Sequence, residues 1–422
     1  MFDKSLSRNK GSRSFSAVGT GDGHDLQYDP PPACIGNAIC IIDEPLRQRT
    51  ADVPQPKKAD AIRCAHFRNG SMAAMTAGII ERYAAYLPVT ATTPRVTLGE
   101  GSTPLVRSSR IGPSIGIEQL YFKYEGLNPS GSFKDRGMAV ATAKALEAGA
   151  QALLCASTGN TSASASAYAA RCGLRAVVVV PVGGIAAGKL AQALAYGATI
   201  VSVKSSFDAA LKLVRQLADQ PGVALVNSVN PFRIEGQKTG AFEIVEQLGH
   251  APAQLFIPVG NGGNITAYWR GFGEIVMTAG GSAPRMHGAQ AEGAAPLVRG
   301  RPVARPRTVA SAIRIGNPAS WAGAIAARDE SGGTIESVSD AEIMAAHHRL
   351  AREEGLLVEP ASAASVALLL RRTKARQVTE GGAIVCVLTG HGLKDPQALT
   401  RGLKMPRPVE PTLTAIRRAL QA

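Results

Sequence analysis

The chain has 422 residues, of which 45% are hydrophobic and 18% are charged, and its formal net charge is +14. This length is enough to bury a large core and predicts two or three domains. No apolar run approaches the roughly 20 residues that a membrane-spanning helix needs. Met1–Asp60 also lacks the apolar core of a secretory signal. We therefore expect a soluble cytoplasmic protein without a membrane partner.

Residues 1–71 differ in composition from the rest of the chain. They contain two proline clusters, many Gly and Ser residues and no sustained hydrophobic period, which predicts a disordered N-terminal extension. Met72 and Met75 stand immediately before the first orderly segment. We therefore hypothesise that translation naturally starts near these methionines and that the extension is not made in the native protein.

Continuous apolar runs alternate with helical segments from residue 119 onward. The continuous runs that predict strands are Ala152–Ala156, Ala176–Val180, Thr199–Val203, Val223–Val226, Leu255–Val259, Met286–Ala289 and Ala383–Leu388, and a shorter run of alternating apolar residues predicts a further strand at Gln119–Tyr124. Helices are predicted at Ile79–Tyr86, Met138–Ala148, Ser164–Cys172, Lys189–Tyr196, Phe207–Ala218, Lys238–Leu248 and Asp340–Glu354. Continuous apolar strands are typical of parallel sheets that helices cover on both faces. The fold class predicted is α/β, with two doubly wound sheets.

The stretch Leu127–Gly137 follows the first strand and leads into a helix. Its Asn-Pro and Ser-Gly pairs mark a turn, and Ser130 or Ser132 is placed to cap the helix. Lys134 then falls in the first helical turn, where the helix dipole disfavours a cation. A lysine that is kept neutral is a nucleophile that can form a Schiff base with an aldehyde. The alternative is a solvated surface lysine.

Four strands are followed by small, polar, glycine-rich loops. These loops are Ser157–Ser162, Asn227–Arg233, Gly260–Thr266 and Thr389–Asp395. Ligands of such sheets bind beyond the carboxyl ends of the strands, so we expect the four loops to converge on one cleft.

Each loop has a distinct binding capacity. Gly260–Asn264 can present backbone N–H groups to a phosphate at a helix start, although a simple tight turn remains the alternative. Ser157–Thr161 suits a carboxylate, and Thr389 offers a neutral hydroxyl to an aromatic nitrogen. Arg233 can bind a second anion; its alternative is a surface ion pair with Glu235.

Other motifs are set aside. Gly183–Lys189 matches a P-loop pattern, but Leu190 replaces the hydroxyl residue that would hold magnesium. The six cysteines form no C-x-x-C pair and no zinc spacing, so no metal is expected. Cys155 and Cys386 lie within apolar strands, as core thiols of a reducing compartment do. The basic residues of the C-terminal region, which ends in a basic tail at 406–422, lack interleaved aromatics, and no nucleic-acid partner is expected.

The segments Glu125–Met138, Ala156–Ser164, Val226–Lys238, Pro258–Tyr268, Glu359–Ser365 and Thr389–Pro396 resemble the threonine synthase family. This family consists of pyridoxal-phosphate enzymes of fold type II, the tryptophan-synthase-β type. The resemblance covers most of the chain from about Gly78 to Pro396, and the segment from Asn227 to Lys238 is the part most particular to threonine synthases.

The resemblance implies roles for individual residues. Lys134 would carry pyridoxal 5′-phosphate and act as the catalytic base. The other cofactor-binding residues implied are Asn160, Gly260, Asn261, Gly262, Gly263, Asn264 and Thr389. The substrate-binding residues implied are Ser157, Thr158, Asn160 and Thr161 for the carboxylate, with Asn227, Ser228 and Arg233 for the phosphate.

The implied reaction converts O-phospho-L-homoserine and water into L-threonine and phosphate by γ-elimination and β-hydration. A smaller mobile domain, residues 117–230, would close on a larger one formed by 72–116 and 231–405, and relatives suggest a homodimer. The alternatives are cysteate synthase, a threonine or serine dehydratase, or a non-catalytic ligand-binding homologue. A dehydratase has no substrate phosphate for Arg233 to hold, and a non-catalytic homologue has no use for a Schiff-base lysine.

Overall fold

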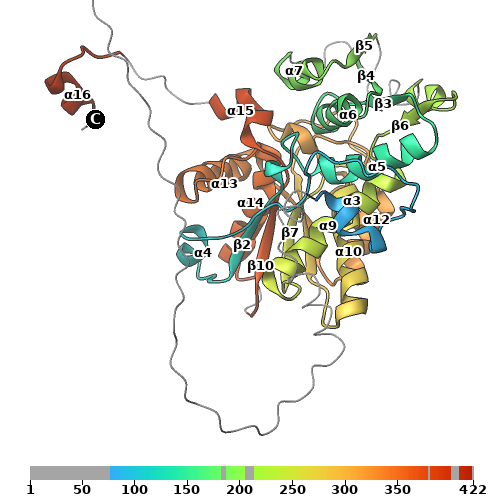
Figure 1. Ribbon diagram of the computed structural model, residues 1–422. Helices are drawn as coiled ribbons and strands as arrows, with labels where there is room; N and C mark the ends of the chain where they lie inside the picture. The colour runs from blue at the N-terminus through green and yellow to red at the C-terminus, as the bar shows by residue number, and fades with distance from the viewer. Residues whose placement is uncertain (1–76, 182–186, 205–212, 379–380, 401–407, 421–422) are drawn as a thin grey trace, which may run out of the picture. The chain divides into compact units, whose positions relative to one another are not determined.

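The computed structural model describes residues 77–181, 187–204, 213–378, 381–400 and 408–420. The predicted N-terminal extension, most of the P-loop-like segment 183–189 and the first half of the predicted helix Phe207–Ala218 lie outside the described residues. The described parts form a mixed α/β fold with two sheets (Figure 1). The predicted fold class is therefore confirmed.

The larger sheet has six strands in the order β1-β2-β10-β7-β8-β9. The strands are β1 (Leu105–Arg107), β2 (Leu120–Tyr124), β7 (Gln254–Pro258), β8 (Arg285–Ala291), β9 (Thr334–Val338) and β10 (Ile384–Leu388). Only the β1–β2 pair is antiparallel, and every other pair in this sheet is parallel. The parallel strands therefore bring the loops that follow them to one edge of the sheet.

The smaller sheet has four parallel strands in the order β5-β4-β3-β6. They are β3 (Ala152–Ala156), β4 (Arg175–Pro181), β5 (Thr199–Val203) and β6 (Val223–Leu225). All four lie within the range 117–230 predicted for the smaller domain. β2 also lies in that range but pairs with β10 of the larger sheet, so assigning this strand to the smaller domain was wrong. The apolar run at 119–124 does not indicate which sheet takes the strand.

The α-helices are α3 (Ile79–Arg82), α4 (Ile111–Ser114), α5 (Lys134–Glu147), α6 (Asn160–Arg171), α7 (Ala187–Ala195), α9 (Pro231–Leu248), α10 (Gly263–Ala279), α11 (Pro296–Arg299), α12 (Trp321–Glu330), α13 (Asp340–Glu353), α14 (Pro360–Lys374), α15 (Pro396–Thr400) and α16 (Leu413–Leu420). Short 3₁₀ helices are η1 (Ala84–Tyr86), η2 (Glu125–Leu127), η3 (Ser311–Ile313) and η4 (Gly392–Lys394). Among the described residues, no helix is both long and apolar enough to cross a bilayer.

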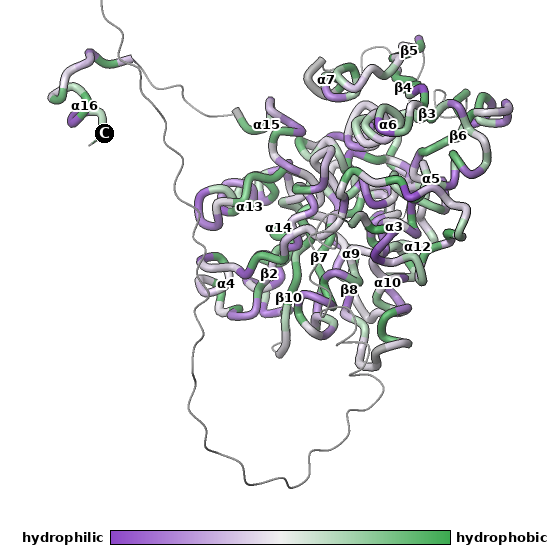
Figure 2. The backbone as a smooth tube through the Cα atoms, in the orientation of Figure 1, coloured by the Kyte–Doolittle hydropathy of each residue, from purple (hydrophilic) through white to green (hydrophobic). Residues whose placement is uncertain are grey.

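Alternate residues of β10 face two different cores. Ile384, Cys386 and Leu388 pack with α13 and α14, whereas Val385 and Val387 pack with α9, α10 and α12. Because side chains of a strand point alternately to opposite faces, a strand covered on both faces must be apolar throughout. The continuous green stretch along β10 in Figure 2 shows this pattern. Burial on both faces explains why a continuous apolar run in the sequence predicted this strand.

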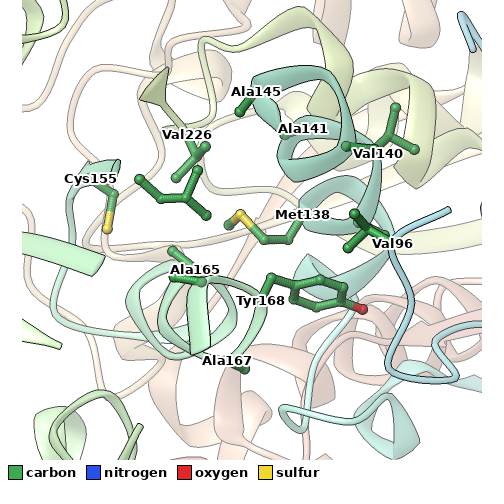
Figure 3. Close-up of a cluster of buried hydrophobic side chains, with 14 of the residues drawn as sticks. Val96, Met138, Val140, Ala141, Ala145, Cys155, Ala165, Ala167, Tyr168 and Val226 are labelled. Carbon is green, nitrogen blue, oxygen red and sulfur yellow. The ribbon is translucent and has the colours of Figure 1, made fainter. Parts of the chain in front are cut away.

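The core of the smaller sheet centres on Met138 of α5. Figure 3 shows its side chain among Val226, Cys155 and residues of α6, which include Ala165 and Tyr168. All of these residues are buried. The helix that begins at Lys134 is thus anchored by its second turn in a packed core, which fixes the position of its first turn.

Two strands were not predicted from the sequence. β1 has only three residues, too few to show a period. β9 has two buried apolar residues, Ile335 and Val338, among polar neighbours. Both strands lie at the edges of the larger sheet, where one side lacks a pairing strand. An edge strand carries a weaker apolar signal because it is less completely covered.

Candidate active site

Lys134 is the first residue of α5, which agrees with its predicted place in the first helical turn, although the helix begins before the predicted Met138. The residue before it, Phe133, provides no side-chain cap. Ser132 Oγ accepts a long hydrogen bond of 3.4 Å from the Lys134 N–H. The prediction that Ser130 could cap the helix is wrong, because its hydroxyl donates instead to Asp135 Oδ1 at 2.6 Å. The buried carboxylate of Asp135 therefore ties the turn to the helix that follows it.

The lysine turn lies directly against the loop that follows β10. Ser132 and Gly390 form an antiparallel bridge, and the Phe133 N–H donates to the Thr389 carbonyl at 3.0 Å. The Thr389 hydroxyl is buried and lies 3.0 Å from Ser362 Oγ. The lysine turn and the Thr389–Asp395 loop are thus held together by backbone hydrogen bonds, and Lys134 is one residue away from this contact.

The Ser157–Ser162 loop joins the other two segments through Asn160, the first residue of α6. The Asn160 amide nitrogen donates to Glu359 Oε1 at 2.9 Å. A Cβ atom on Gly390 would lie 3.3 Å from that nitrogen and 2.4 Å from Glu359 Oε1. Glycine at position 390 is therefore required by the close approach of these two side chains.

Arg233 is fully buried and lies beside α5. Its Nη1 donates to the Val226 carbonyl at 2.7 Å, but Nε and Nη2 have no hydrogen-bond partner among the described residues. A Cβ atom on Gly137 would lie 2.7 Å from Arg233 Nε, so the guanidinium packs against α5 one turn beyond Lys134. A buried cation with two unused donor groups is suited to bind an anion.

The alternative of an Arg233–Glu235 surface ion pair is wrong. Glu235 pairs instead with Lys238 at 2.8 Å and with Arg270 at 2.5 Å. Arg233 points the other way, into the protein, with 0% of its surface exposed. The two residues thus make separate contacts: Arg233 lies in the interior near the site, whereas Glu235, itself only 9% exposed, pairs with Lys238 and Arg270.

Burial, together with the smaller effect of the nearby charge of Arg233, lowers the pKa of Lys134 to about 7, whereas Glu359 opposes the shift. Burial likewise lowers the pKa of Arg233 to about 10. The prediction of a neutral amine at position 134 is thus supported, but with desolvation rather than the helix dipole as the larger cause. Close to neutral pH, much of this amine is unprotonated and able to act as a nucleophile or a base.

The loop after β7 begins α10, and its Gly262 adopts a left-handed backbone with φ of +81°. Both polar atoms of the Asn264 side chain are buried without a hydrogen-bond partner among the described residues. A Cβ atom on Gly263 would lie 3.4 Å from Ile234, the neighbour of Arg233 on α9. The loop thus borders the same site, and its unused amide and helix N-terminus fit a phosphate group.

The remaining predicted substrate residues line the ends of the smaller sheet. The Asn227 amide exchanges two 2.9 Å hydrogen bonds with the backbone of Ala156, so it clamps β3 to the end of β6. Ser157 Oγ accepts from the Gly159 N–H at 3.2 Å. The other predicted substrate residues differ in burial: Thr158 and Ser228 are half-buried, and Thr161 is buried.

Sequence reasoning assigned no role to Glu359, although it lies between Asn160 and Gly390. A signal existed, since a glutamate directly before a proline at a helix start is placed for an N-terminal cap. The residue contributes its carboxylate to the site rather than to a side-chain cap. Its importance comes from its contact with Asn160, 199 positions earlier in the chain, across Gly390, and no local pattern contains this contact.

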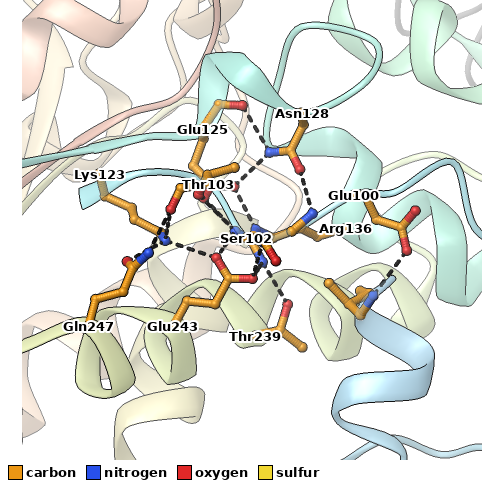
Figure 4. Close-up of polar contacts among 12 residues, drawn as sticks. Glu100, Ser102, Thr103, Lys123, Glu125, Asn128, Arg136, Thr239, Glu243 and Gln247 are labelled. Carbon is orange, nitrogen blue, oxygen red and sulfur yellow. Dashed lines mark hydrogen bonds and ion pairs between the residues drawn. The ribbon is translucent and has the colours of Figure 1, made fainter. Parts of the chain in front are cut away.

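A second group of charges surrounds Arg136, two residues beyond Lys134 on α5 (Figure 4). Arg136 donates to Glu125 at 2.7 and 2.8 Å and to Glu243 at 2.7 and 2.8 Å. Lys123 donates to Glu243 at 2.8 Å and to Gln247 at 2.9 Å. Burial alone would raise the pKa of Glu243, but Arg136 and Lys123 hold it well below its usual value. This group joins β2, α5 and α9.

The chain was compared with known proteins. Residues 96–390 match the family described as pyridoxal-phosphate dependent enzyme. The chain is 56% identical over 322 residues to threonine synthase of Bacillus sp. (strain ULM1), covering 76% of this chain and 91% of that protein. It is 55% identical over 347 residues to threonine synthase of Synechocystis sp., covering 81% and 90%.

Among solved structures, a T.th. threonine deaminase matches with a TM-score of 0.58 and 26% identity, covering 72% of this chain and 94% of that one. Maize serine racemase matches with a TM-score of 0.61 and 21% identity, covering 76% and 91%. The second likeness shows the fold alone.

Proposed function

Because the chain belongs to the threonine synthase family of pyridoxal-phosphate dependent enzymes, we propose that its site converts O-phospho-L-homoserine and water into L-threonine and phosphate through Lys134. The chain is thus a pyridoxal-phosphate dependent lyase, and the recognition made from the sequence motifs is confirmed. The observation that carries the residue assignment is a desolvated amine beside a buried guanidinium with unused donors.

The residues around Lys134 fit the cofactor. The amine of Lys134 would hold its aldehyde carbon, Asn160 would donate to its ring oxygen, and Thr389 would face its pyridine nitrogen. Its phosphate would lie at the start of α10, on Gly260, Asn261, Gly262, Gly263 and Asn264. The buried, unpartnered amide of Asn264 supports this placement. When bound, pyridoxal phosphate supplies an electron sink for carbanions at the substrate α-carbon.

The substrate carries two anionic groups, and the site offers two places for them. The carboxylate would bind at the start of α6, on Ser157, Thr158, Asn160 and Thr161, where helix N–H groups favour an anion. The phosphate would bind to Arg233 with Asn227 and Ser228. Because the Asn227 amide already clamps Ala156, we assign the larger part of phosphate binding to Arg233.

Lys134 would move protons to and from the substrate whenever its amine is free of the cofactor. A lysine with a pKa lowered to about 7 is able both to accept and to return a proton near neutral pH. Arg233 sustains this state because a second cation nearby disfavours protonation of the amine. The same guanidinium would neutralise the departing phosphate, so one residue would serve both binding and proton transfer.

Three further assignments belong to this proposal. The smaller domain, predicted at 117–230 but without β2, which pairs in the larger sheet, would close over the larger one, 72–116 and 231–405, to exclude water. The enzyme would act in the cytoplasm, which the free thiols of Cys155 and Cys386 support. It would form a homodimer, as the family resemblance implies.

The direct test is turnover of O-phospho-L-homoserine by the purified holoenzyme, with L-threonine and phosphate expected in equal amounts. O-phospho-L-serine with sulfite tests the cysteate synthase alternative, and L-threonine alone tests a dehydratase; neither is expected to be consumed. Complete absence of product with all three would favour the non-catalytic homologue.

Replacement of Lys134 gives the most demanding test of the residue assignment. Lys134→Ala is expected to abolish turnover and the visible absorbance of bound cofactor together, because the covalent link is lost. Lys144→Ala, on the same helix but paired with Glu147 on the surface side, is the matched control and should retain both. Measurable turnover by Lys134→Ala would contradict the assignment.

A further inference from the structure

Glu359 occupies a position where three segments of the site meet. Its backbone N–H donates to the Gly390 carbonyl at 3.0 Å, and its own carbonyl accepts from the Ser362 N–H at 2.9 Å at the start of α14. The residue is 4% exposed. Its backbone therefore fixes the loop that carries Thr389, and its side chain is held on the inner side of that loop.

The carboxylate of Glu359 determines how the Asn160 amide is turned. Glu359 Oε1 accepts from the Asn160 nitrogen at 2.9 Å, and an ionised carboxylate only accepts hydrogen bonds. The amide therefore has its nitrogen toward Glu359, and the second N–H of that nitrogen is the one left for a ligand. Reversing the amide would set two acceptor oxygens against each other in a buried place, which costs free energy.

Gly390 keeps the carboxylate against Asn160. A Cβ atom at position 390 would lie 2.4 Å from Glu359 Oε1 and 2.7 Å from its carboxyl carbon. Contacts below about 3 Å force one group to move. Any side chain at position 390 would therefore displace the carboxylate from the amide, although position 390 itself makes no contact that needs a side chain.

We propose that Glu359 is a positioning residue that holds the Asn160 amide nitrogen toward the ring oxygen of pyridoxal phosphate. This inference rests on the proposed function only for the cofactor, and not for the substrate. In addition, Glu359 is the anion that offsets Arg233 at Lys134. Other charged or titratable groups that influence Lys134, Arg233 or the adjoining loops are Asp135, Cys155, His391 and Lys394.

The charge of Glu359 gives a spectroscopic readout that a purely structural residue would not affect. In the holoenzyme, the visible absorbance of the cofactor changes with protonation of the nitrogen that joins it to Lys134. An anion nearby stabilises the protonated form. Removing the anion should therefore move the pH midpoint of the absorbance change downward.

The experiment compares the wild-type holoenzyme with Glu359→Gln, Glu359→Asp and the surface control Asp329→Asn. The pH midpoint of the visible absorbance and the dissociation constant for pyridoxal phosphate are measured for each. For Glu359→Gln we expect a midpoint lower by about one pH unit and a dissociation constant raised about tenfold. Asp329→Asn should match the wild type, because Asp329 is exposed.

Glu359→Asp separates charge from position. It keeps the anion but withdraws the oxygen by one methylene, so the pH midpoint should stay near that of the wild type while the dissociation constant rises. Gly390→Ala, which displaces the carboxylate from the outside, should raise the dissociation constant in the same way. If Glu359→Gln fails to fold, these two variants decide the question.

Wild-type values of both quantities in Glu359→Gln, or a wild-type dissociation constant in Glu359→Asp and Gly390→Ala, would overturn the inference. The outcome is distinct from that of the proposed function. An enzyme that binds the cofactor with these shifts but does not consume O-phospho-L-homoserine would contradict the proposed substrate and leave the role of Glu359 intact.

Discussion

Lys134 and Arg136 are basic residues two positions apart on α5, but their surroundings differ. Every guanidinium nitrogen of Arg136 has a hydrogen-bond acceptor, and two carboxylates balance its charge together with that of Lys123. Lys134 faces Arg233, another cation, whose Nε and Nη2 have no partner among the described residues. The paired group stabilises the fold, and the incompletely paired group is left to bind ligands.

The difference has a physical reason. Buried charges cost free energy unless they are paired and hydrogen-bonded. In the group of Arg136 this cost is offset inside the protein, so no ligand is needed there. At Lys134 and Arg233 the cost is only partly offset, which an anionic ligand would correct. The site is therefore less stable than its surroundings in the absence of ligands, as is common for functional sites.

The largest effect on stability is expected from breaking the paired group. Arg136→Met should lower the free energy of unfolding by about 3–5 kcal/mol, because Glu125 then remains buried without its cation and Glu243 keeps only Lys123. Urea denaturation followed by circular dichroism measures the change. Lys123→Met is the matched variant, with a smaller loss since Arg136 still pairs with Glu243. A change below about 1 kcal/mol for Arg136→Met would show that the group is not structural.

Arg233→Met is expected to have the opposite effect: it should impair catalysis and leave stability intact. It removes a buried cation with unused donors, so the stability should be kept or improved, whereas kcat/KM for O-phospho-L-homoserine should fall about 10²–10³-fold. Arg233→Lys should recover only part of the activity, because it lacks the planar fork that binds phosphate. Steady-state kinetics measures the activity, and thermal unfolding measures the stability. A stability loss equal to that of Arg136→Met would show that Arg233 also stabilises the fold.

The contrast also predicts a pH dependence. In enzyme stripped of cofactor, the neutral amine of Lys134 is the reactive form, so the rate of cofactor uptake should rise with pH around a midpoint of about 7. Arg233 lowers the pKa of this amine, so Arg233→Met should move the midpoint upward. Stopped-flow absorbance between pH 6 and 9 measures the uptake, and identical midpoints in the two proteins would refute the coupling.

The smallest effect is expected for a charge pair on the surface. Arg328 and Asp329 lie 2.6 Å apart, but both side chains are partly or largely exposed. Solvent screens such a pair, so Arg328→Ala should leave the melting temperature unchanged within about 1 °C. Thermal unfolding beside Arg136→Met would show that burial, rather than distance, separates the two ion pairs. An equal loss in both variants would contradict this explanation.

Local patterns were sufficient for much of the fold. The continuous apolar runs predicted the strands that helices cover on both faces, such as β3 and β10, because burial on both faces requires apolar residues at every position. The turn residues before Lys134 predicted that this lysine lies in the first helical turn, although the helical run itself was recognised only from Met138, four residues after α5 begins. Local patterns did not predict β9 or the membership of β2 in the larger sheet, since the strands that pair with them come from distant parts of the chain.

The candidate site divides in the same way. The sequence by itself determined the family, and it predicted Lys134 as the reactive lysine and the glycine-rich loop before Ile265 as the phosphate site, because each depends on a contiguous motif. Only the tertiary structure decided that burial lowers the pKa of Lys134, that Arg233 faces inward away from Glu235, and that Glu359 meets Asn160 across Gly390. Desolvation and charge coupling depend on distances between segments far apart in the chain, and these distances exist only once the chain has folded.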